Sequence, residues 1–353
     1  MNVFELINPT TISVYWDSKK VDQSTYLGEK LFPATKVIGL ELSKIGGRDG
    51  VPVQLKASAF DTQATFRDRL GIEMTKTKLP FFRERMKIDE EVRQQILAIS
   101  NDSILKQYVN RIFDDKMNLL RGARASRERM AMELISTGHV TINGNGVKMD
   151  YNYGVSNKQK VKATTAWTDT ANSKPLQDLS DWSDYARTKF HVQMGFAVMT
   201  TKTFNLLKAS ESVVANLYPN STNQSKMFVS NQQVKDLVQL ATGLTILIND
   251  NVYADEVGGA SKPFFPDYTI SLIPVSGRLG NMTFGTTPEE VDLATNAKTA
   301  GNTTIVDTGV AIYTRLIDHP VNVETIVSQI VLPSLGTDMV EDGAGSFLIG
   351  KVD

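Results

Sequence analysis

The sequence predicts an α+β fold in which one very long helix joins strand-forming segments to a separate α/β unit. Three patterns lead to this prediction. Apolar residues recur at steps of three and four between residues 102 and 137, which is typical of one amphipathic helix. Short apolar strands alternate with helical segments between about residues 176 and 276, and residues 309–353 contain long strand-like runs. Helices and strands that are partly segregated along the chain indicate the mixed α+β class.

The composition is that of a folded protein with no strong overall charge. The chain has 353 residues, of which 41% are hydrophobic and 22% charged, and its formal net charge is −1. This length allows two domains, and any affinity for nucleic acid or membrane must come from a local patch. The absence of cysteine excludes disulfide bonds, thiolate metal sites and a cysteine nucleophile. Because the sequence has no signal-peptide pattern and no run of about 18 apolar residues, we expect cytoplasmic synthesis and no membrane partner.

The first segment, residues 1–48, is expected to be an extended arm. Pro33 disfavours a continuous helix, and the residues after it are typical of a strand. These apolar residues are Val37, Ile38, Leu40 and Leu42. An extended start of this kind would find its partner strand in another subunit. An edge strand of the same subunit is an equally good interpretation.

The second segment, residues 49–88, predicts a hairpin with two strand-like halves around Gly71. Little apolar surface is available to bury both faces, and an isolated two-stranded ribbon is only marginally stable in water. We therefore expect the ribbon to rest on another subunit or on its parent domain. Arg67, Arg69 and Glu73 crowd the bend and are our candidates for contacts between subunits.

The third segment, residues 89–159, is dominated by the long helix. Asp89 can cap a short helix before it, and Gly138 follows its last periodic residue, where a left-handed C-cap residue would lie. Roughly 35 residues at about 1.5 Å each give a helix about 50 Å long. Apolar residues become sparse after Ala123, so we expect this part to be weakly buried by its own chain.

The second half of this helix is basic. Its charged face is either solvated or directed at a surface shared with neighbouring subunits or with packaged nucleic acid. On the second interpretation, Arg121, Arg124 and Arg127 are candidate DNA contacts on an inner face.

The remaining chain predicts a hairpin, a compact unit and a set of closing strands. Asn145-Gly146 is a strong turn signal between two strands after Gly138. Residues 156–175 are expected to form a loop, 176–276 an α/β unit with its own core, and 277–308 a poorly patterned excursion. We expect the final strands to pair with those that follow Gly138, so that the middle region is an insertion.

Catalytic motifs are absent from the sequence. The three histidines are isolated, no pair has metal-ligand spacing, and no phosphate-binding loop occurs. We therefore expect neither an enzyme nor a cofactor or metal site. If the middle unit were nevertheless an enzyme, Trp182, His191 and Asp250 would be the residues to test.

The order and the amino-acid sequences of three stretches resemble the lambda-type major capsid protein family of tailed phages. They are YLGEKLFPATKVIGLEL at residues 26–42, the segment from LKASAFDTQATFRDRLGIEM to QQI at 55–96, and MAMELISTGHVTIN at 130–143. The closing NVETIVSQIVLPSLGTDMVEDGAGSFLIGKV also suits this family. The resemblance implies a Hong-Kong-97-like capsid fold. It would divide the chain into an N-arm (1–48), an E-loop (49–88), a P-domain (89–159) with spine helix 102–137, an A-domain (160–308) and P-domain return strands (309–353).

The resemblance implies a major capsid protein that assembles itself, as hexamers and pentamers, into the icosahedral head shell of a tailed phage. The shell would enclose double-stranded DNA, bound weakly and without sequence specificity. A decoration protein, a scaffolding protein and a portal would be further partners, and synthesis would take place in the host cytoplasm. The alternative is another phage assembly protein, such as a tail-tube or connector component, which would hardly need a helix about 50 Å long.

Overall fold

The computed structural model describes residues 8–20, 26–47, 72–99, 102–219, 228–295, 302–319, 321–336 and 347–353. The chain forms two compact units. The first unit comprises Met1–Leu42, Lys76–Arg129 and Asn281–Ser334, and the second comprises Ser43–Thr75, Met130–Gly280 and Leu335–Asp353. The five-segment division expected from the sequence stays a prediction.

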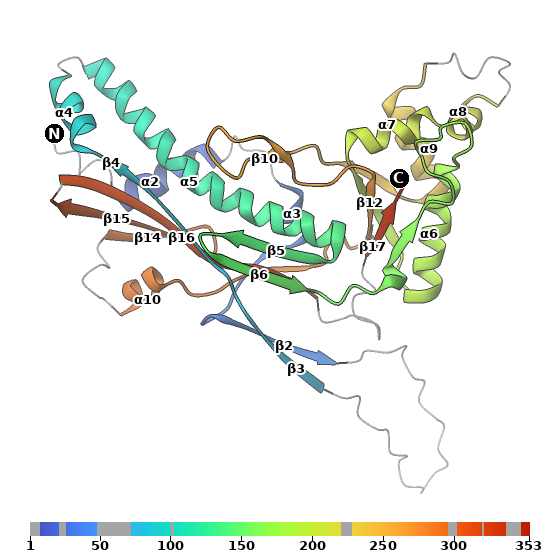
Figure 1. The fold of residues 1–353 in the computed structure, drawn as a ribbon, viewed down its shortest axis with the longest axis horizontal. Coiled ribbons are helices and arrows are strands. Elements are labelled where there is room, and N and C mark those ends of the chain that lie inside the picture. The colour runs from blue at the N-terminus through green and yellow to red at the C-terminus, as the bar shows by residue number, and fades with distance from the viewer. Residues whose placement is uncertain are drawn as a thin grey trace, which may run out of the picture. The chain divides into compact units, whose positions relative to one another are not determined.

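The first unit is built on one mixed sheet with helices. Its elements are α2 (Pro9–Lys20), α3 (Leu27–Leu31), β1 (Ala34–Lys36), β4 (Phe81–Ile88), α4 (Glu90–Ala98), β13 (Gly280–Phe284), α10 (Pro288–Ala294), β14 (Thr303–Val306), β15 (Val310–Asp318) and β16 (Val321–Leu335). The strand order is β1-β13-β16-β15-β14, and β4 also pairs with β16. Figure 1 shows β4, β15 and β16 side by side.

Helix α2 corrects the extended arm that the sequence predicted. Ile12 and Trp16 are both 1% exposed and lie one helical turn apart, so they form the buried face of this helix. The side chain of Asn8 accepts a hydrogen bond from the Thr11 amide at 2.8 Å and caps the helix start. Two apolar residues among polar ones were too short a pattern to recognise. The strand expected after Pro33 is partly confirmed by β1, which pairs in parallel with β13 of the same chain.

The long helix α5 (Asp102–Thr137) has the bounds that the sequence predicted. Gly138 has a φ of +82°, as expected of a left-handed C-cap residue. A Cβ at this position would lie 2.6 Å from Cβ of Val155, so close packing also requires glycine. The predicted cap of α4 is confirmed, because the Asp89 side chain accepts from the Val92 amide.

The pairing expected for the closing strands is wrong for β15 and β16, whereas the last strand, β17 (Leu348–Lys351), pairs in parallel with β7 (Lys160–Lys162), which follows Gly138. Strand β16 pairs antiparallel with β15 on one side and with β4 on the other, where Val323 lies opposite Ile88 and Ile330 opposite Phe81. The strands after Gly138, β5 (His139–Gly144) and β6 (Val147–Asn152), pair with each other. Residues 277–308 are also more regular than expected, because they contain β13, α10 and β14.

The ribbon predicted in the second segment is present with a different first strand. β2 (Glu41–Gly47) and β3 (Ile72–Lys78) form a two-stranded sheet. The half that was expected at residues 53–59 lies outside the described residues.

The second unit contains the predicted α/β arrangement. Besides β5 and β6, its elements are η1 (Asn157–Gln159), β7 (Lys160–Lys162), α6 (Pro175–Phe190), β8 (Met194–Met199), α7 (Thr201–Ala209), α8 (Glu211–Leu217), α9 (Asn231–Thr242), β9 (Thr245–Ile248), β10 (Val252–Tyr253), β11 (Lys262–Pro263), β12 (Thr269–Pro274) and β17 (Leu348–Lys351). The sheet order is β7-β17-β12-β8-β9. Positive φ angles at Asn145 and Gly146 confirm the predicted turn between β5 and β6.

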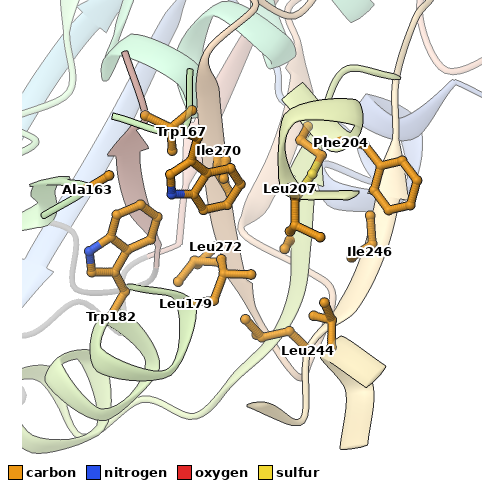
Figure 2. Close-up of a cluster of buried hydrophobic side chains, with 14 of the residues drawn as sticks. Ala163, Trp167, Leu179, Trp182, Phe204, Leu207, Leu244, Ile246, Ile270 and Leu272 are labelled. Carbon is orange, nitrogen blue, oxygen red and sulfur yellow. The ribbon is translucent and has the colours of Figure 1, made fainter. Parts of the chain in front are cut away.

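The core of the second unit lies between its sheet and its helices. Figure 2 shows Trp167 and Trp182 in this cluster with Leu179 and Leu272, and α6 supplies Trp182 and Leu179. The indole N–H of Trp167 donates to Asp178 at 2.9 Å, so its polar atom is satisfied although the ring is fully buried.

Candidate functional site: buried charges around the long helix

Arg127 of α5 is held inside the first unit by groups from two other segments. Its Nη1 donates to Gln329 Oε1 at 3.0 Å, and its Nη2 donates to Asp307 Oδ2 at 3.2 Å. The side chain is 8% exposed, and its guanidinium carbon lies 5.5 Å from the centroid of the Phe284 ring. Burial lowers the pKa of Arg127, while the nearby Asp307 raises it. Because an arginine stays protonated in proteins, this is an ion pair between a buried guanidinium and a carboxylate that is 15% exposed.

Arg124 and Glu128 fasten α3 to the same helix. Arg124 donates through Nε and Nη2 to the two carboxylate oxygens of Glu29, at 2.5 and 2.7 Å. Its guanidinium carbon lies 5.2 Å from the centroid of the Tyr26 ring. Glu128 Oε2 accepts from the Gly28 amide in the first turn of α3 at 2.8 Å. The hydrogen bond to Glu29 raises the pKa of Arg124. The bidentate Arg124–Glu29 pair and the bond to Gly28 together position residues 26–29 against α5.

These contacts leave one of the three predicted DNA-binding arginines available on the surface of α5. Only Arg121 of the three candidates is exposed, and it donates to Asn118 on its own helix at 3.0 Å. Arg124 and Arg127 are each 7% exposed and are paired within the chain. The second half of α5 is therefore well buried, contrary to the expectation. The predicted contact residues Arg67 and Arg69 lie outside the described residues, as does the side chain of Glu73 in β3.

The face of the first sheet that points away from α5 carries further ion pairs, which were not predicted from the sequence. Glu324 of β16 accepts from Arg85 of β4 at 3.1 Å and from Arg315 of β15 at 2.9 Å. Glu289 of α10 accepts from Arg83 of β4 at 2.5 Å and from Ser328 of β16 at 2.8 Å. Because β4 lies next to β16, these carboxylates tie α10 and three strands together. The charged residues that alternate along β4, in the sequence FFRERMKI at residues 81–88, could have indicated these ion pairs.

Lys116 is a buried amine on the inner face of α5. It is 2% exposed, and its Nζ donates to Met86 O of β4 at 3.2 Å. Burial lowers the pKa of Lys116 from its ordinary 10.5 to about 8, although Asp115 and Glu324 oppose the shift.

Replacing Lys116 by methionine is expected to change how stability depends on pH. Between about pH 8 and 10.5 the unfolded wild-type chain keeps the proton that the folded chain has lost, so wild-type stability rises with pH in this window. Relative to Lys116→Met, the rise should reach up to about 3 kcal/mol. Urea unfolding of both proteins at low salt, from pH 7 to 10.5, measures the difference. Parallel profiles would contradict a lowered pKa.

Trp182, His191 and Asp250 were the residues to test for an enzymatic activity, and each has a different structural role. Trp182 packs in the core of the second unit, and His191 ends α6 with a φ of 55°. Asp250 accepts from the amide and hydroxyl of Thr201 at the start of α7. In the described part of the chain, no group of three or more His, Asp or Glu side chains could hold a metal ion. None of the described helices is both long and apolar enough to cross a membrane.

Solved structures with a similar fold include two phage-related proteins. The putative capsid protein of a prophage of E. coli CFT073 is 14% identical, with a TM-score of 0.60, and the match covers 98% of this chain and 99% of that one. A phage-related protein from Bordetella bronchiseptica RB50 is 13% identical, with a TM-score of 0.54, and the match covers 98% and 97%. None of the curated proteins matches the chain.

The family comparison covers nearly the whole chain. The family model described as phage major capsid protein E matches residues 9–335. Together with the structural likeness, this match confirms the predicted α+β fold of the Hong-Kong-97 type and the predicted role. The chain belongs to the phage major capsid protein E family and is a protein of the phage head shell.

Proposed function

We propose that copies of this chain close, as hexamers and pentamers, into an icosahedral shell around the double-stranded DNA of a tailed phage. Membership of a capsid family supports assembly into a homo-oligomer. The observation that carries the proposal is a patch of exposed apolar side chains in the first unit. Its members are Ile38 (97% exposed) and Leu40 (50%), which flank Gly39, and we call it the Ile38 patch.

The Ile38 patch is held in place by the backbone rather than by flexible side chains. The Gly39 amide donates to Thr286 Oγ1 at 3.1 Å, and the Thr286 amide donates to Gly39 O at 3.0 Å. Lys36 and Glu290 form an ion pair beside it. A rigid apolar patch bordered by charges has the composition of a protein interface, and a second copy of this chain is the occupant that a shell requires.

Ile38→Asp is expected to prevent shell formation while leaving the fold intact, because the side chain is almost fully exposed in the single chain. Electron microscopy would show shells for the wild type and unassembled protein for the variant, and the melting temperatures should agree. Val257→Asp, at a fully exposed position of the second unit, is the control for a charge introduced elsewhere. Normal shells from Ile38→Asp would remove the patch from the interface, whereas wild-type tubes would favour the tail-tube alternative.

Arg121 is the remaining candidate for DNA contact on α5. Arg121→Glu is expected to weaken binding to DNA of any sequence and to reduce the slope of log K against log salt concentration by about 1. Fluorescence anisotropy with a labelled duplex between 50 and 200 mM salt would measure this slope, at roughly the range in which counterion release dominates. Arg111→Glu, at an exposed position of the same helix, is the control. An unchanged slope would place Arg121 on a solvated face.

The finer features of the family resemblance belong to the same proposal. They include a decoration protein, a scaffolding protein and a portal as partners, synthesis in the host cytoplasm, and contacts between subunits through Arg67, Arg69 and Glu73. We also propose that the protein has no catalytic activity. The separate structural roles of Trp182, His191 and Asp250 support this.

A further inference from the structure

Lys116 is buried beside its one hydrogen-bond acceptor among the described residues, Met86 O at 3.2 Å. An ammonium has three N–H donors, so the Met86 carbonyl leaves part of this capacity unused. The nearest charges do not fill it. Asp115 is half-exposed and pairs with Arg111, while Glu324 is held by arginines on the other face of the sheet.

Two buried hydroxyl groups share this region and are also unsatisfied. Thr325 is 0% exposed and Thr314 is 7% exposed, and neither Oγ1 has a hydrogen-bond partner within the described part of the chain. The strand register places Met86 opposite Thr325, and Thr325 opposite Thr314. Directly opposed residues point to the same face of a sheet, and neighbouring strands are about 4.8 Å apart. The two hydroxyls therefore lie in the row of opposed residues that begins at Met86, whose backbone carbonyl accepts from Lys116.

This row lies on the sheet face that α5 covers. Gln329 of β16 donates to Ala123 O of α5, so the Gln329 side chain points toward the helix. Thr325 lies four residues before Gln329 on the same strand, and its side chain therefore points to the same face. The surrounding side chains are apolar and buried, among them Ile112, Met117, Val323 and Val327. Water outside the protein therefore does not solvate the ammonium or the hydroxyls.

The chemistry of these groups selects a ligand that is small and negatively charged. A buried charge without compensation costs several kcal/mol, and each unsatisfied buried donor costs about 1–3 kcal/mol. An anion can accept hydrogen bonds from the ammonium and both hydroxyls while neutralising the charge, whereas a water molecule leaves the charge in place. A monatomic ion with one charge suits one ammonium and two hydroxyls better than phosphate or sulfate, whose four oxygens and additional charge these groups would leave partly unsatisfied.

We propose that Lys116, Thr325 and Thr314 form a binding site for one small monovalent anion of the halide class, between α5 and the sheet of the first unit. The bound ion would join α5 to β16 and β15 through charge and hydrogen bonds. Nothing in this proposal depends on shell formation or on DNA.

The first test is the halide dependence of thermal stability. Melting temperatures of the full chain would be measured in mixtures of sodium chloride and sodium gluconate at a fixed sodium concentration, since gluconate is too large for the site. The wild-type value should rise by at least about 2 °C as chloride increases 100-fold. Lys116→Met should remove this response and Thr325→Val should reduce it.

Lys87→Met is the matched control, because Lys87 is an exposed lysine next to Met86 and should keep the wild-type response. A wild-type melting temperature that ignores chloride, or a response that survives in Lys116→Met, would overturn the proposal. A crystal grown in bromide provides the second test. An anomalous peak within hydrogen-bond distance of Lys116 Nζ supports the site, and a water molecule at that place refutes it.

Discussion

Arg127→Met is expected to lower the free energy of unfolding by about 3–5 kcal/mol. The substitution removes the cation paired with the Asp307 carboxylate and the donor to Gln329 Oε1, while Gln329 is 1% exposed and the Asp307 side chain is 15% exposed. A methionine fills most of the vacated volume, so the loss reports mainly the missing ion pair and hydrogen bond and not a cavity. Urea unfolding at neutral pH measures the change as a shift of the midpoint at constant slope.

The comparison with Arg121→Met separates burial from charge. Arg121 lies on the same helix but is exposed, so its substitution should change stability by no more than about 0.5 kcal/mol. Adding Asp307→Asn to Arg127→Met should recover part of the loss, because the carboxylate charge is then absent as well and asparagine tolerates the φ of 50° at this position. A loss below about 1 kcal/mol for Arg127→Met would show that the pair contributes little.

The parts of the fold that sequence predicted well depend on neighbours along the chain. The bounds of α5 follow from apolar spacing and from Gly138, and the turn at Asn145-Gly146 follows from two residues that accept positive φ. Local rules of this kind require no knowledge of what packs above or below. Helix α2 is the exception, because Ile12 and Trp16 are too few to show a period.

Long-range pairing could not be predicted because the sequence holds no distances. Arg127 lies 180 positions from Asp307, and Arg124 lies 95 from Glu29. The arginines therefore looked like a solvated or DNA-facing surface, whereas each has a carboxylate of its own chain. The predicted partner of β16 was wrong for the same reason. The observed partner, β4, is more than two hundred residues away, and no local pattern distinguishes β4 from β5 as a partner.

Lys116 shows that part of the missed chemistry was visible. Ile112 and Phe113 precede it by four and three residues, and Leu120 follows by four, so the lysine occupies a place in the apolar stripe of α5. A charged residue at such a place predicts a buried amine. The hydroxyls of Thr314 and Thr325 could not be added to it without the strand register.

Trp182→Ala is expected to lower the stability of the second unit by about 3–5 kcal/mol, because the ring is 6% exposed and its loss leaves a cavity in the core. The ring packs against the backbone of β17. A Cβ added to Gly350 would lie only 2.5 Å from Cζ3 of Trp182, so Gly350→Ala alone should cost about 1–3 kcal/mol through overpacking.

The two substitutions should therefore compensate each other. In the Trp182→Ala background the added methyl group meets a cavity instead of the ring, so Gly350→Ala should become nearly neutral or stabilising. A double-mutant cycle by urea unfolding should give a coupling energy of about 1–3 kcal/mol. Additive losses would mean that the ring does not restrict β17, and that glycine at position 350 serves the strand backbone instead.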